Sequence, residues 1–267
     1  MNQEFDPDVV ANYERETWSR CADGYMATFA GITRETVPLL IESAGIKPGH
    51  EVLEIGSGPG HVANLLVQAG ASVAGVDFSV EMIEVARRRY PAIVFKQADA
   101  EELPFEAGSF DAVVANFVVH HLARPETVFR EVNRVLKPGG RFAFAVWGAP
   151  EEQSSIGAFF GAVMAHHDLE ELPHGPLFGV TDRDVYEPLL AQAALKDCQL
   201  SVHEVTWKED SLDPILRGFW EWGNMAVLPS ETQTRIKETT RENAQPYEKD
   251  GRYSFPHSIL FGSARKT

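Results

Sequence analysis

Short runs of apolar and β-branched residues alternate along this chain with segments in which apolar residues recur at helical spacing. Such alternation predicts crossover units, in which each helix connects two parallel strands of one sheet. The runs that predict strands are residues 51–55, 72–76, 93–97, 110–115, 141–147, 198–207 and 258–266. The helical patterns that follow four of them are residues 61–69, 80–89, 125–136 and 181–194. We therefore predict an α/β fold with a doubly wound sheet.

A long segment, residues 208–252, separates the last two predicted strands. It is rich in Trp, Pro and charged residues, and it is too long for an ordinary connecting loop. Phe219, Trp222 and Met225 recur in it at helical spacing, which predicts a helix with one apolar face. We predict a single domain made of two N-terminal helices in residues 1–46, a core in residues 47–207 and 253–267, and a helical cap in residues 208–252.

The first predicted strand runs into a loop that has glycine at every second position, namely Gly56, Gly58 and Gly60. Glycine lets a ligand approach the main chain, and the loop after the first strand is where doubly wound sheets bind nucleotide-like ligands. A tight turn without a ligand is the alternative. The dinucleotide fingerprint G-x-G-x-x-G requires a third glycine in the slot that His61 occupies here, which disfavours NAD.

A carboxylate stands beside this loop. Glu54 lies two residues before Gly56, on the strand end that faces the loop. Its charge would repel a pyrophosphate at the helix N-terminus and would suit a ligand that carries an ammonium group. These residues predict a nucleoside attached to a cationic amino acid, with an NAD(P)-linked oxidoreductase as the alternative.

Two further acids follow the next two strands. Asp77 ends the second strand roughly 20 residues after Gly56, where an acid accepts ribose hydroxyls in nucleoside-binding sheets. Asp99 and Ala100 follow the third strand, where a carboxylate would accept an adenine amino group. Each acid alone is also typical of a turn or an N-cap. Three acids at the ends of three successive strands favour a binding site.

Four stretches of the sequence resemble the motifs of a known family in order and spacing, and they are VLEIGSGPG, AGVDFS, QADAEELPFEAGSFDAVVANFVVHHL and VLKPGGRFAFAVW. The family is that of the class I S-adenosylmethionine-dependent methyltransferases, and the closest resemblance is to the small-molecule group that includes the ubiquinone and menaquinone biosynthesis methyltransferases. It covers about residues 47–147. The resemblance implies a Rossmann-like sheet of seven strands in the order 3-2-1-4-5-7-6, with only the seventh antiparallel. It also implies methyl transfer from S-adenosyl-L-methionine to a small organic molecule, which leaves S-adenosyl-L-homocysteine.

The resemblance also implies which residues hold the cofactor. The loop after the first strand would face its methionine part, and the ends of the next strands would contact the ribose, the adenine and the methionine end. The residues are Glu54, Gly56, Ser57, Gly58 and Gly60 for the methionine part, Asp77 for the ribose, Phe78 and Met82 for the two sides of the adenine, Asp99 and Ala100 for its amino group, and Asn116 and Phe117 for backbone contacts to the methionine end.

Two adjacent histidines are the candidate catalytic residues. The methyl group of a sulfonium is already activated, so alignment of the nucleophile supplies much of the catalysis. An oxygen or nitrogen nucleophile can also need a base, and His120 and His121 titrate in the right range at the expected mouth of the site. A packing or helix-entry role is the alternative, and we favour it for both.

Aromatic residues outside the motifs are candidates for the acceptor pocket and for its closure. Trp147, Trp220 and Trp222 are the candidate substrate-binding residues, together with Phe159 and Phe160, although aromatic side chains are more often core. We expect Trp220 to lie nearer to the opening than Trp222, which belongs to the apolar stripe. The N-terminal residues that would close the cofactor site are Tyr13, Trp18 and Tyr25.

One cluster, HHDLEE at residues 166–171, places His and Glu four residues apart, which is compatible with a metal site. A solvated polar helix face explains the same pattern, and we predict that no metal is bound.

Composition narrows the class of partner. With 24 Lys and Arg against 39 Asp and Glu, the chain carries a net charge of −15, which argues against nucleic acid and anionic membrane surfaces as partners. Two cysteines make no disulfide framework, and the stretch MNQEFDPDVV lacks the basic and apolar regions of a signal peptide. No apolar run approaches the length of a membrane span. We expect a cytoplasmic protein with a small-molecule acceptor, and the alternative from another class is an S-adenosylmethionine-binding protein without catalysis.

Overall fold

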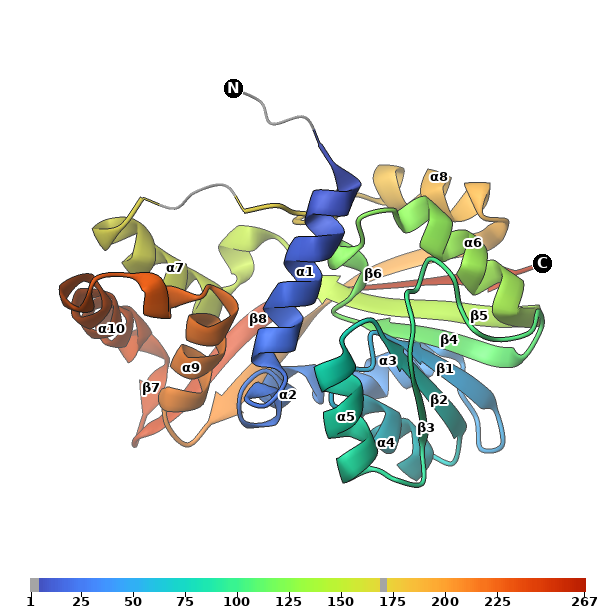
Figure 1. The fold of residues 1–267 in the computed structure, drawn as a ribbon, viewed down its shortest axis with the longest axis horizontal. Coiled ribbons are helices and arrows are strands. Elements are labelled where there is room, and N and C mark those ends of the chain that lie inside the picture. Colours follow the sequence, from blue (N-terminus) through green and yellow to red (C-terminus); the bar gives the residue numbers. More distant parts are fainter. Residues whose placement is uncertain (1–4, 169–171) are drawn as a thin grey trace.

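A single mixed sheet runs through the molecule in the order β3-β2-β1-β4-β5-β8-β6, with β7 attached to β8 (Figure 1). The computed structural model describes residues 5–168 and 172–267. The strands are β1 Glu51–Ile55, β2 Ser72–Asp77, β3 Val94–Gln97, β4 Phe110–Asn116, β5 Leu136–Trp147, β6 Leu195–Glu209, β7 Glu248–Lys249 and β8 Arg252–Lys266. The α-helices are α1 Pro7–Cys21, α2 Ala30–Thr33, α3 Val37–Ala44, α4 His61–Gln68, α5 Val80–Arg89, α6 Pro125–Val135, α7 Ser154–His166, α8 Arg183–Gln192, α9 Asp213–Trp222 and α10 Ser230–Ala244. Short 3-10 helices are η1 Tyr25–Ala27, η2 Val119–His121, η3 Pro150–Glu152, η4 Met225–Val227 and η5 Gln245–Tyr247.

The predicted fold class and strand order are confirmed. The strand that follows the cap, β8, is antiparallel to both of its neighbours, while β1 to β5 pair in parallel. The sequence did not predict the two-residue strand β7, so the seventh strand of the prediction is β8. Strands β6 and β8 are also longer than expected, at 15 residues each, and they continue past the sheet as a paired ribbon.

Helices cover both faces of the sheet. Adjacent residues of β1 point to opposite sides, so that Val52 belongs to the apolar core under α3 and α4, and Leu53 to the core under α6 and α8. Burial on both faces explains why the central parallel strands are continuous apolar runs rather than alternating ones. The carboxyl ends of these strands are left open between the two helical layers, which is where ligands bind to such sheets.

The N-terminal segment forms three α-helices, whereas two were expected. The first helix, α1, is capped by Asp6, whose side chain accepts a hydrogen bond from the Asp8 backbone N–H at 2.9 Å. Polar side chains bond the backbone between α2 and α3, one from the same segment and one from the end of β4. Thr36 donates to the Thr33 carbonyl oxygen at 2.7 Å, and Asn116 donates to the same oxygen at 2.8 Å. These bonds compete with helical hydrogen bonds and break the helix between α2 and α3.

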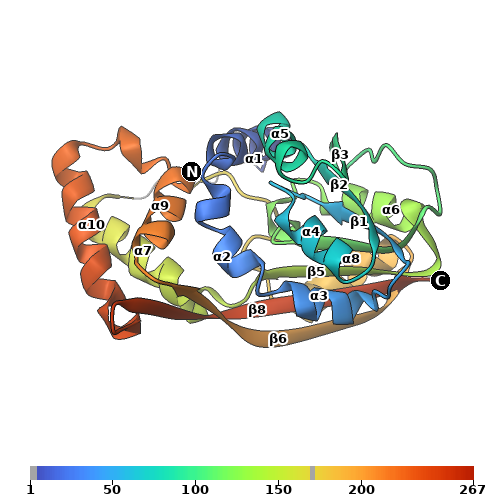
Figure 2. The same cartoon turned by 90° about the horizontal axis from the view of Figure 1, so that it is seen from below.

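The segment that was predicted as a helical cap contains α9 and α10. Together with α7 they gather at one end of the molecule, around the ends of β6 and β8 (Figures 1 and 2). Helix α1 packs against both α5 and α9, so it lies between the sheet domain and these helices (Figure 1). Within the described ranges, no helix is both long and apolar enough to span a bilayer.

Candidate active site

The loop between β1 and α4 leaves an open space in front of its backbone. Gly58 and Gly60 have φ of +50° and +83°, which L side chains rarely adopt. A Cβ on Gly60 would approach Phe95 Cζ to 2.6 Å, so this glycine allows close packing on β3. A Cβ on Gly58 would meet nothing nearer than the Met82 sulfur at 3.9 Å. Gly58 therefore exposes its main chain to the space where a ligand would lie.

That space is part of a cavity at the carboxyl edge of the sheet. Its walls come from the carboxyl ends of β1, β2 and β4, from the chain after β3, and from α1. Nine of the predicted cofactor residues line it, and they are Gly56, Gly58, Asp77, Phe78, Met82, Asp99, Ala100, Asn116 and Phe117. The other three, Glu54, Ser57 and Gly60, are buried and do not line the cavity.

Asp77 joins the end of β2 to the glycine loop. Its Oδ2 accepts from the Gly58 backbone N–H at 2.8 Å, and its Oδ1 accepts from the Ser79 backbone N–H at 2.9 Å. Burial raises the pKa of this carboxyl to about 6, and the backbone hydrogen bonds oppose that rise. A carboxylate has about four lone-pair sites, so two remain for hydroxyl groups of a ligand in the cavity.

Glu54 is buried at 2% exposure, and its Oε2 has no hydrogen-bond partner among the described residues. Burial raises the pKa of this carboxyl well above its usual range, a backbone N–H from Ala63 opposes the rise, and the charge of Asp77 adds to it. A buried carboxyl oxygen without a partner is costly unless a ligand satisfies it. Glu54 does not line the cavity, so its contact with a cationic group of the ligand stays a prediction.

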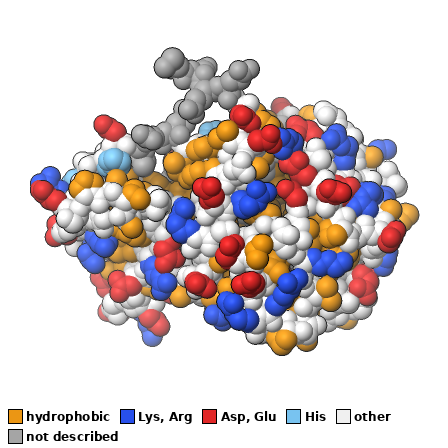
Figure 3. Space-filling model, viewed as in Figure 1, with side chains coloured by type: hydrophobic (Ala, Val, Ile, Leu, Met, Phe, Trp, Pro, Cys, Tyr) orange, Lys and Arg blue, Asp and Glu red, His pale blue; other side chains and the backbone are white. Residues whose placement is uncertain are grey.

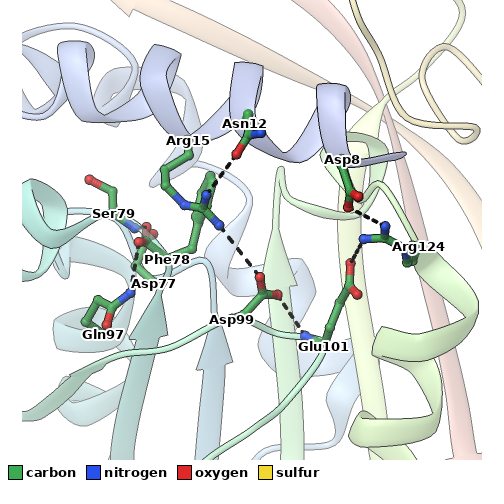
Figure 4. Close-up of polar contacts among 10 residues, drawn as sticks. All are labelled: Asp8, Asn12, Arg15, Asp77, Phe78, Ser79, Gln97, Asp99, Glu101 and Arg124. Atoms are coloured by element: carbon green, nitrogen blue, oxygen red, sulfur yellow. Dashed lines mark hydrogen bonds and ion pairs between the residues drawn. The ribbon is translucent and has the colours of Figure 1, made fainter. Parts of the chain in front are cut away.

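Asp99 faces an arginine that the sequence did not single out. Arg15 of α1 places Nη2 at 3.9 Å from Asp99 Oδ2, and its guanidinium carbon lies 5.6 Å from the centre of the Phe78 ring (Figure 4). Arg124 also holds the start of α1, because it donates hydrogen bonds both to Asp8 of that helix and to Glu101 (Figure 4). Helix α1 thus covers the part of the cavity where Phe78 and Asp99 lie.

A second cavity adjoins the first and shares four wall residues with it, which are Trp18, Tyr25, Phe117 and His121. Its remaining walls are mainly apolar, and they include Phe29, Ile32, Trp147, Ile156, Phe160, Phe178, Phe219 and Trp222. Among the described residues that line it, none is Asp, Glu, Lys or Arg. The chain therefore places an aromatic, uncharged cavity directly beside the one that holds the acids.

The predicted acceptor residues divide between this cavity and the outer surface of the cap. Trp147 and Trp222 line the cavity, whereas Trp220 does not. Trp220 instead packs edge-on against Phe159, with Lys237 Nζ 4.4 Å from its ring centre. The expectation that Trp220 lies nearer to the opening than Trp222 is wrong, because the apolar stripe of α9 faces the cavity and Trp220 faces α10.

The two candidate histidines lie at the boundary of the cavities in different environments. His121 lines both cavities, and its Nδ1 lies 2.9 Å from Oε1 of Glu14, a buried residue of α1. His120 lines only the aromatic cavity, and its Nδ1 has no partner among the described residues. Burial lowers the pKa of His120 well below its usual range, and the neighbouring His121 adds to this effect.

His61, in the slot where a dinucleotide site has glycine, ties the loop to the N-terminal segment. Its Nε2 lies 2.7 Å from the Thr33 hydroxyl, and burial lowers its pKa to about 3, so the ring is neutral. Asn116 accepts from the Thr36 hydroxyl at 2.8 Å in the same region. A side chain at this position therefore anchors the N-terminal helices to the site, which a third glycine would not do.

Sequence reasoning missed Glu14 and Arg15, because no local pattern brings α1 to residues that lie about 80 to 110 positions later. Of the N-terminal aromatics that it did propose, Trp18 and Tyr25 line both cavities, and Tyr13 lines neither.

The histidine and acid cluster after α7 offers no metal site within residues 5–168 and 172–267, where no group of three or more potential ligands converges. His166 Nε2 instead lies 2.8 Å from the Thr239 hydroxyl. Glu170 and Glu171 lie outside the described residues.

The strand order, the glycine loop after β1 and the acids at the ends of β2 and β3 define a Rossmann-like domain of the methyltransferase class. Residues 53–144 match a protein family described as a methyltransferase domain. This part of the chain is therefore a methyltransferase domain, and the predicted resemblance is confirmed.

Curated relatives match over the same region. The demethylmenaquinone methyltransferase of Renibacterium salmoninarum is 38% identical over 120 residues, which cover 45% of this chain and 51% of the relative. The uncharacterized methyltransferase YcgJ of Bacillus subtilis is 37% identical over 123 residues, which cover 44% of this chain and 49% of the relative. The chain thus spans about half the length of the curated relatives it matches.

Solved structures extend the likeness to most of the fold. The crystal structure of YcgJ from Bacillus subtilis superposes with a TM-score of 0.58 at 25% identity, over 87% of this chain and 98% of that one. Phosphoethanolamine N-methyltransferase 2 of Haemonchus contortus, solved with phosphomonomethylethanolamine and S-adenosylhomocysteine, has a TM-score of 0.54 at 20% identity, over 87% of this chain and 52% of that one, and shows likeness of fold. For the methyltransferase domain, these matches confirm the predicted class of enzyme and S-adenosylmethionine as its cofactor.

Proposed function

We propose that this protein transfers the methyl group of S-adenosylmethionine to a small organic acceptor. The observation that carries the proposal is the pair of adjoining cavities, one lined by Asp77 and Asp99 and the other aromatic and uncharged. They share Phe117 and His121, so a cofactor in the first would meet an acceptor in the second at this boundary.

The first cavity has the side chains that the cofactor needs. Asp77 would accept the ribose hydroxyls, Phe78 and Met82 would flank the adenine, and Asp99 would accept from its amino group. The backbone at Gly58 would lie against the methionine part. When bound, the cofactor supplies a methyl group already activated by its bond to a sulfonium.

The second cavity favours an acceptor that is largely apolar and uncharged at its bound end. Side chains such as Phe117, Trp147 and Trp222 enclose it, and aromatic walls of this kind suit flat apolar molecules. The same walls exclude water, which protects the activated methyl group from unproductive attack. One relative is named for demethylmenaquinone, which supports a small organic acceptor here as well.

The surface charge supports a small acceptor rather than a nucleic acid. The chain carries a net charge of −15, and on the face shown in Figure 3 its Lys and Arg side chains are scattered among Asp and Glu. Such a surface does not concentrate polyanions. The cytoplasmic location stays a prediction.

Calorimetric titration with S-adenosylhomocysteine and with NADH tests the cofactor half of this proposal. We expect one site for S-adenosylhomocysteine and none for NADH. Tight binding of NADH, with no heat from S-adenosylhomocysteine, would support the oxidoreductase alternative and overturn the proposal.

A further inference from the structure

The environment of His121 distinguishes it from every other described residue that lines the two cavities. It follows β4 on the short helix η2, and its ring lies in the wall that the cavities share. Its Nδ1 is engaged by Glu14 at 2.9 Å. Within residues 5–168 and 172–267, no hydrogen bond to its Nε2 is found. Nδ1 is therefore held by its contact with Glu14, and Nε2 is available at the boundary between the two cavities.

Both carboxyl oxygens of Glu14 have a hydrogen-bond partner. The side chain is buried at 6% exposure, its Oε1 faces His121 Nδ1, and its Oε2 accepts from the Trp18 indole N–H at 3.0 Å. The Trp18 ring in turn lies edge-on to the His121 ring, with 5.3 Å between their centres. An ionised carboxylate in this place takes a proton donor on both oxygens, which requires the proton of neutral His121 to reside on Nδ1.

We propose that His121 is the general base of the transfer reaction, that Glu14 is its positioning residue, and that the acceptor group is a hydroxyl on an uncharged, flat apolar molecule. This inference rests on the proposed function and deepens it. With the proton on Nδ1, the Nε2 lone pair faces the shared boundary, where an acceptor hydroxyl in the aromatic cavity would present its proton. The carboxylate of Glu14 then balances the positive charge that His121 acquires.

The acceptor oxygen gives an electron pair to the methyl carbon and forms the new O–C bond. The bond between that carbon and the sulfonium sulfur breaks, and its electron pair stays on sulfur, which becomes neutral. The hydroxyl proton moves to Nε2 of His121, and the imidazolium later releases it to solvent.

His120 does not fit this role, although it lies in the same pocket wall. It has no carboxylate partner, and its burial beside His121, with 4.0 Å between the ring centres, disfavours a charged ring. The two histidines therefore have separate roles, whereas the sequence favoured a structural role for both. His120 packs against Phe117 and Phe178, and His121 takes the proton.

The aromatic cavity also argues for a hydroxyl rather than an amine. An aliphatic amine is a cation near neutral pH, and an ammonium group needs a carboxylate when it is desolvated. No acid is among the described residues that line this cavity, and Glu14 is already bonded to His121 and Trp18. A hydroxyl is neutral when it binds and needs a base when it reacts, which is what this site offers.

The tautomer of His121 tests the proposal without any turnover. Nitrogen-15 NMR of the whole chain, with the ring signals assigned by comparison with His121→Gln, reports which ring nitrogen carries the proton at neutral pH. We expect a neutral ring with the proton on Nδ1 and a bare Nε2. A proton on Nε2, or a ring that is already an imidazolium, would show that His121 has no lone pair to offer and would overturn the proposal.

Substitution of Glu14 tests the positioning role through a rescue. In Glu14→Gln the amide carbonyl can serve only one of its two donors, because the amide NH₂ must face the other. We expect the Nδ1–H form of His121 to be lost or mixed in this variant. We expect it to return in the double variant Glu14→Gln with Trp18→Phe, which removes the competing indole donor. An unchanged tautomer in Glu14→Gln, or no recovery in the double variant, would remove Glu14 from the role.

Transfer to 2-naphthol and 4-nitrophenol, with methyl-labelled S-adenosylmethionine, tests the acceptor class. We expect O-methylated product, a kcat lowered roughly 10²–10⁴-fold by His121→Gln, and a kcat lowered up to roughly 100-fold by Glu14→Gln. Transfer to neither probe, or undiminished transfer in His121→Gln, would overturn this inference. The proposed function would fail on a different result, namely that the wild-type protein does not bind S-adenosylhomocysteine.

Discussion

At the scale of single residues, Asp77 connects the two parts of the cofactor site, because it holds the Gly58 backbone and faces the cavity. We expect Asp77→Ala to keep the fold and to weaken S-adenosylhomocysteine binding about tenfold or more, since hydrogen bonds to a charged group contribute about 1.5–3 kcal/mol each. Calorimetry measures the change. Asp111→Ala is the matched control, because Asp111 accepts from the Glu51 backbone at the other end of the same sheet. Unchanged affinity in a folded Asp77→Ala protein would remove Asp77 from the site.

The raised pKa of Asp77 gives cofactor binding a predictable pH dependence. Its pKa is about 6 in the free protein, and ligand hydroxyls favour the ionised form, so the bound pKa must be lower. Lowering the pH through 6 protonates the free carboxyl first, and the dissociation constant of S-adenosylhomocysteine should rise by up to tenfold per pH unit below that value. Calorimetry at pH 5 to 8 measures this. Asp77→Asn should abolish the dependence near pH 6, and an identical slope in that variant would assign it to another group.

The glycine loop can be tested with two variants that should strain the backbone in a similar way. Gly58 and Gly108 both have positive φ, at +50° and +68°, and an added Cβ would meet no atom within 3.4 Å at either one. Valine should therefore strain both turns, but only Gly58→Val fills the cavity. We expect S-adenosylhomocysteine binding to be lost in Gly58→Val and kept in Gly108→Val. Similar affinity in the two variants would show that the ligand does not approach Gly58.

The candidate cofactor residues that line the first cavity could be predicted because they lie near recognisable strand ends. Asp77 and Asp99 follow apolar runs, and parallel strands bring such positions to one edge. Glu14 and Arg15 could not be predicted, because they sit on an ordinary polar helix and reach the site only through the packing of α1 against α5 and α9. Glu54 was placed on the correct strand end, but it is buried and does not line the cavity.

At the scale of elements, hydrophobic periodicity predicted the sheet strands and the helical character of the cap. It did not predict the break between α2 and α3, which depends on Thr36 and Asn116 and so on a residue from another element. Periodicity also identifies which side chains share one face of α9 without showing what that face packs against. For this reason the prediction named both Trp220 and Trp222 as substrate-binding and placed Trp220 nearer to the opening.

These two tryptophans make a matched pair for testing the cap. Trp222 lines the aromatic cavity, and Trp220, two residues earlier on the same helix, packs beneath Lys237. We expect Trp222→Ala to raise the acceptor KM or lower turnover, with S-adenosylhomocysteine binding kept. We expect Trp220→Ala to change neither. If both variants instead lose several kcal/mol of unfolding free energy, the aromatic residues are scaffold and the cap does not shape the acceptor site.

At the scale of the whole molecule, the two cavities draw on different parts of the chain. The walls of the first come largely from within residues 53–144, which match the methyltransferase family. Most walls of the aromatic cavity lie outside that range, in α1, η1, α2, α7 and α9. The class of cofactor can therefore be predicted from the motifs, whereas the class of acceptor depends on segments that the family match does not cover.

Ligand binding should also be visible in the stability of the entire fold. S-adenosylhomocysteine at 100 times its dissociation constant should stabilise the native state by about 2.7 kcal/mol, because it binds the folded chain alone. Thermal unfolding should show a higher Tm for the wild type and for Trp222→Ala, but a smaller shift for Asp77→Ala at the same concentration. A Tm that does not respond to S-adenosylhomocysteine in the wild type would contradict the assigned cofactor site.

Transfer of a labelled methyl group is the most direct measure of whether this protein methylates a small organic acceptor. The protein is incubated with methyl-labelled S-adenosylmethionine and an extract of small metabolites, and the label is followed into compounds that partition into organic solvent. We expect the wild type to form labelled, apolar products together with S-adenosylhomocysteine. These products should be absent with the Gly58→Val variant and present with the Gly108→Val variant. Binding of S-adenosylhomocysteine without any labelled product would contradict this expectation, and the protein would then be a cofactor-binding module without catalysis.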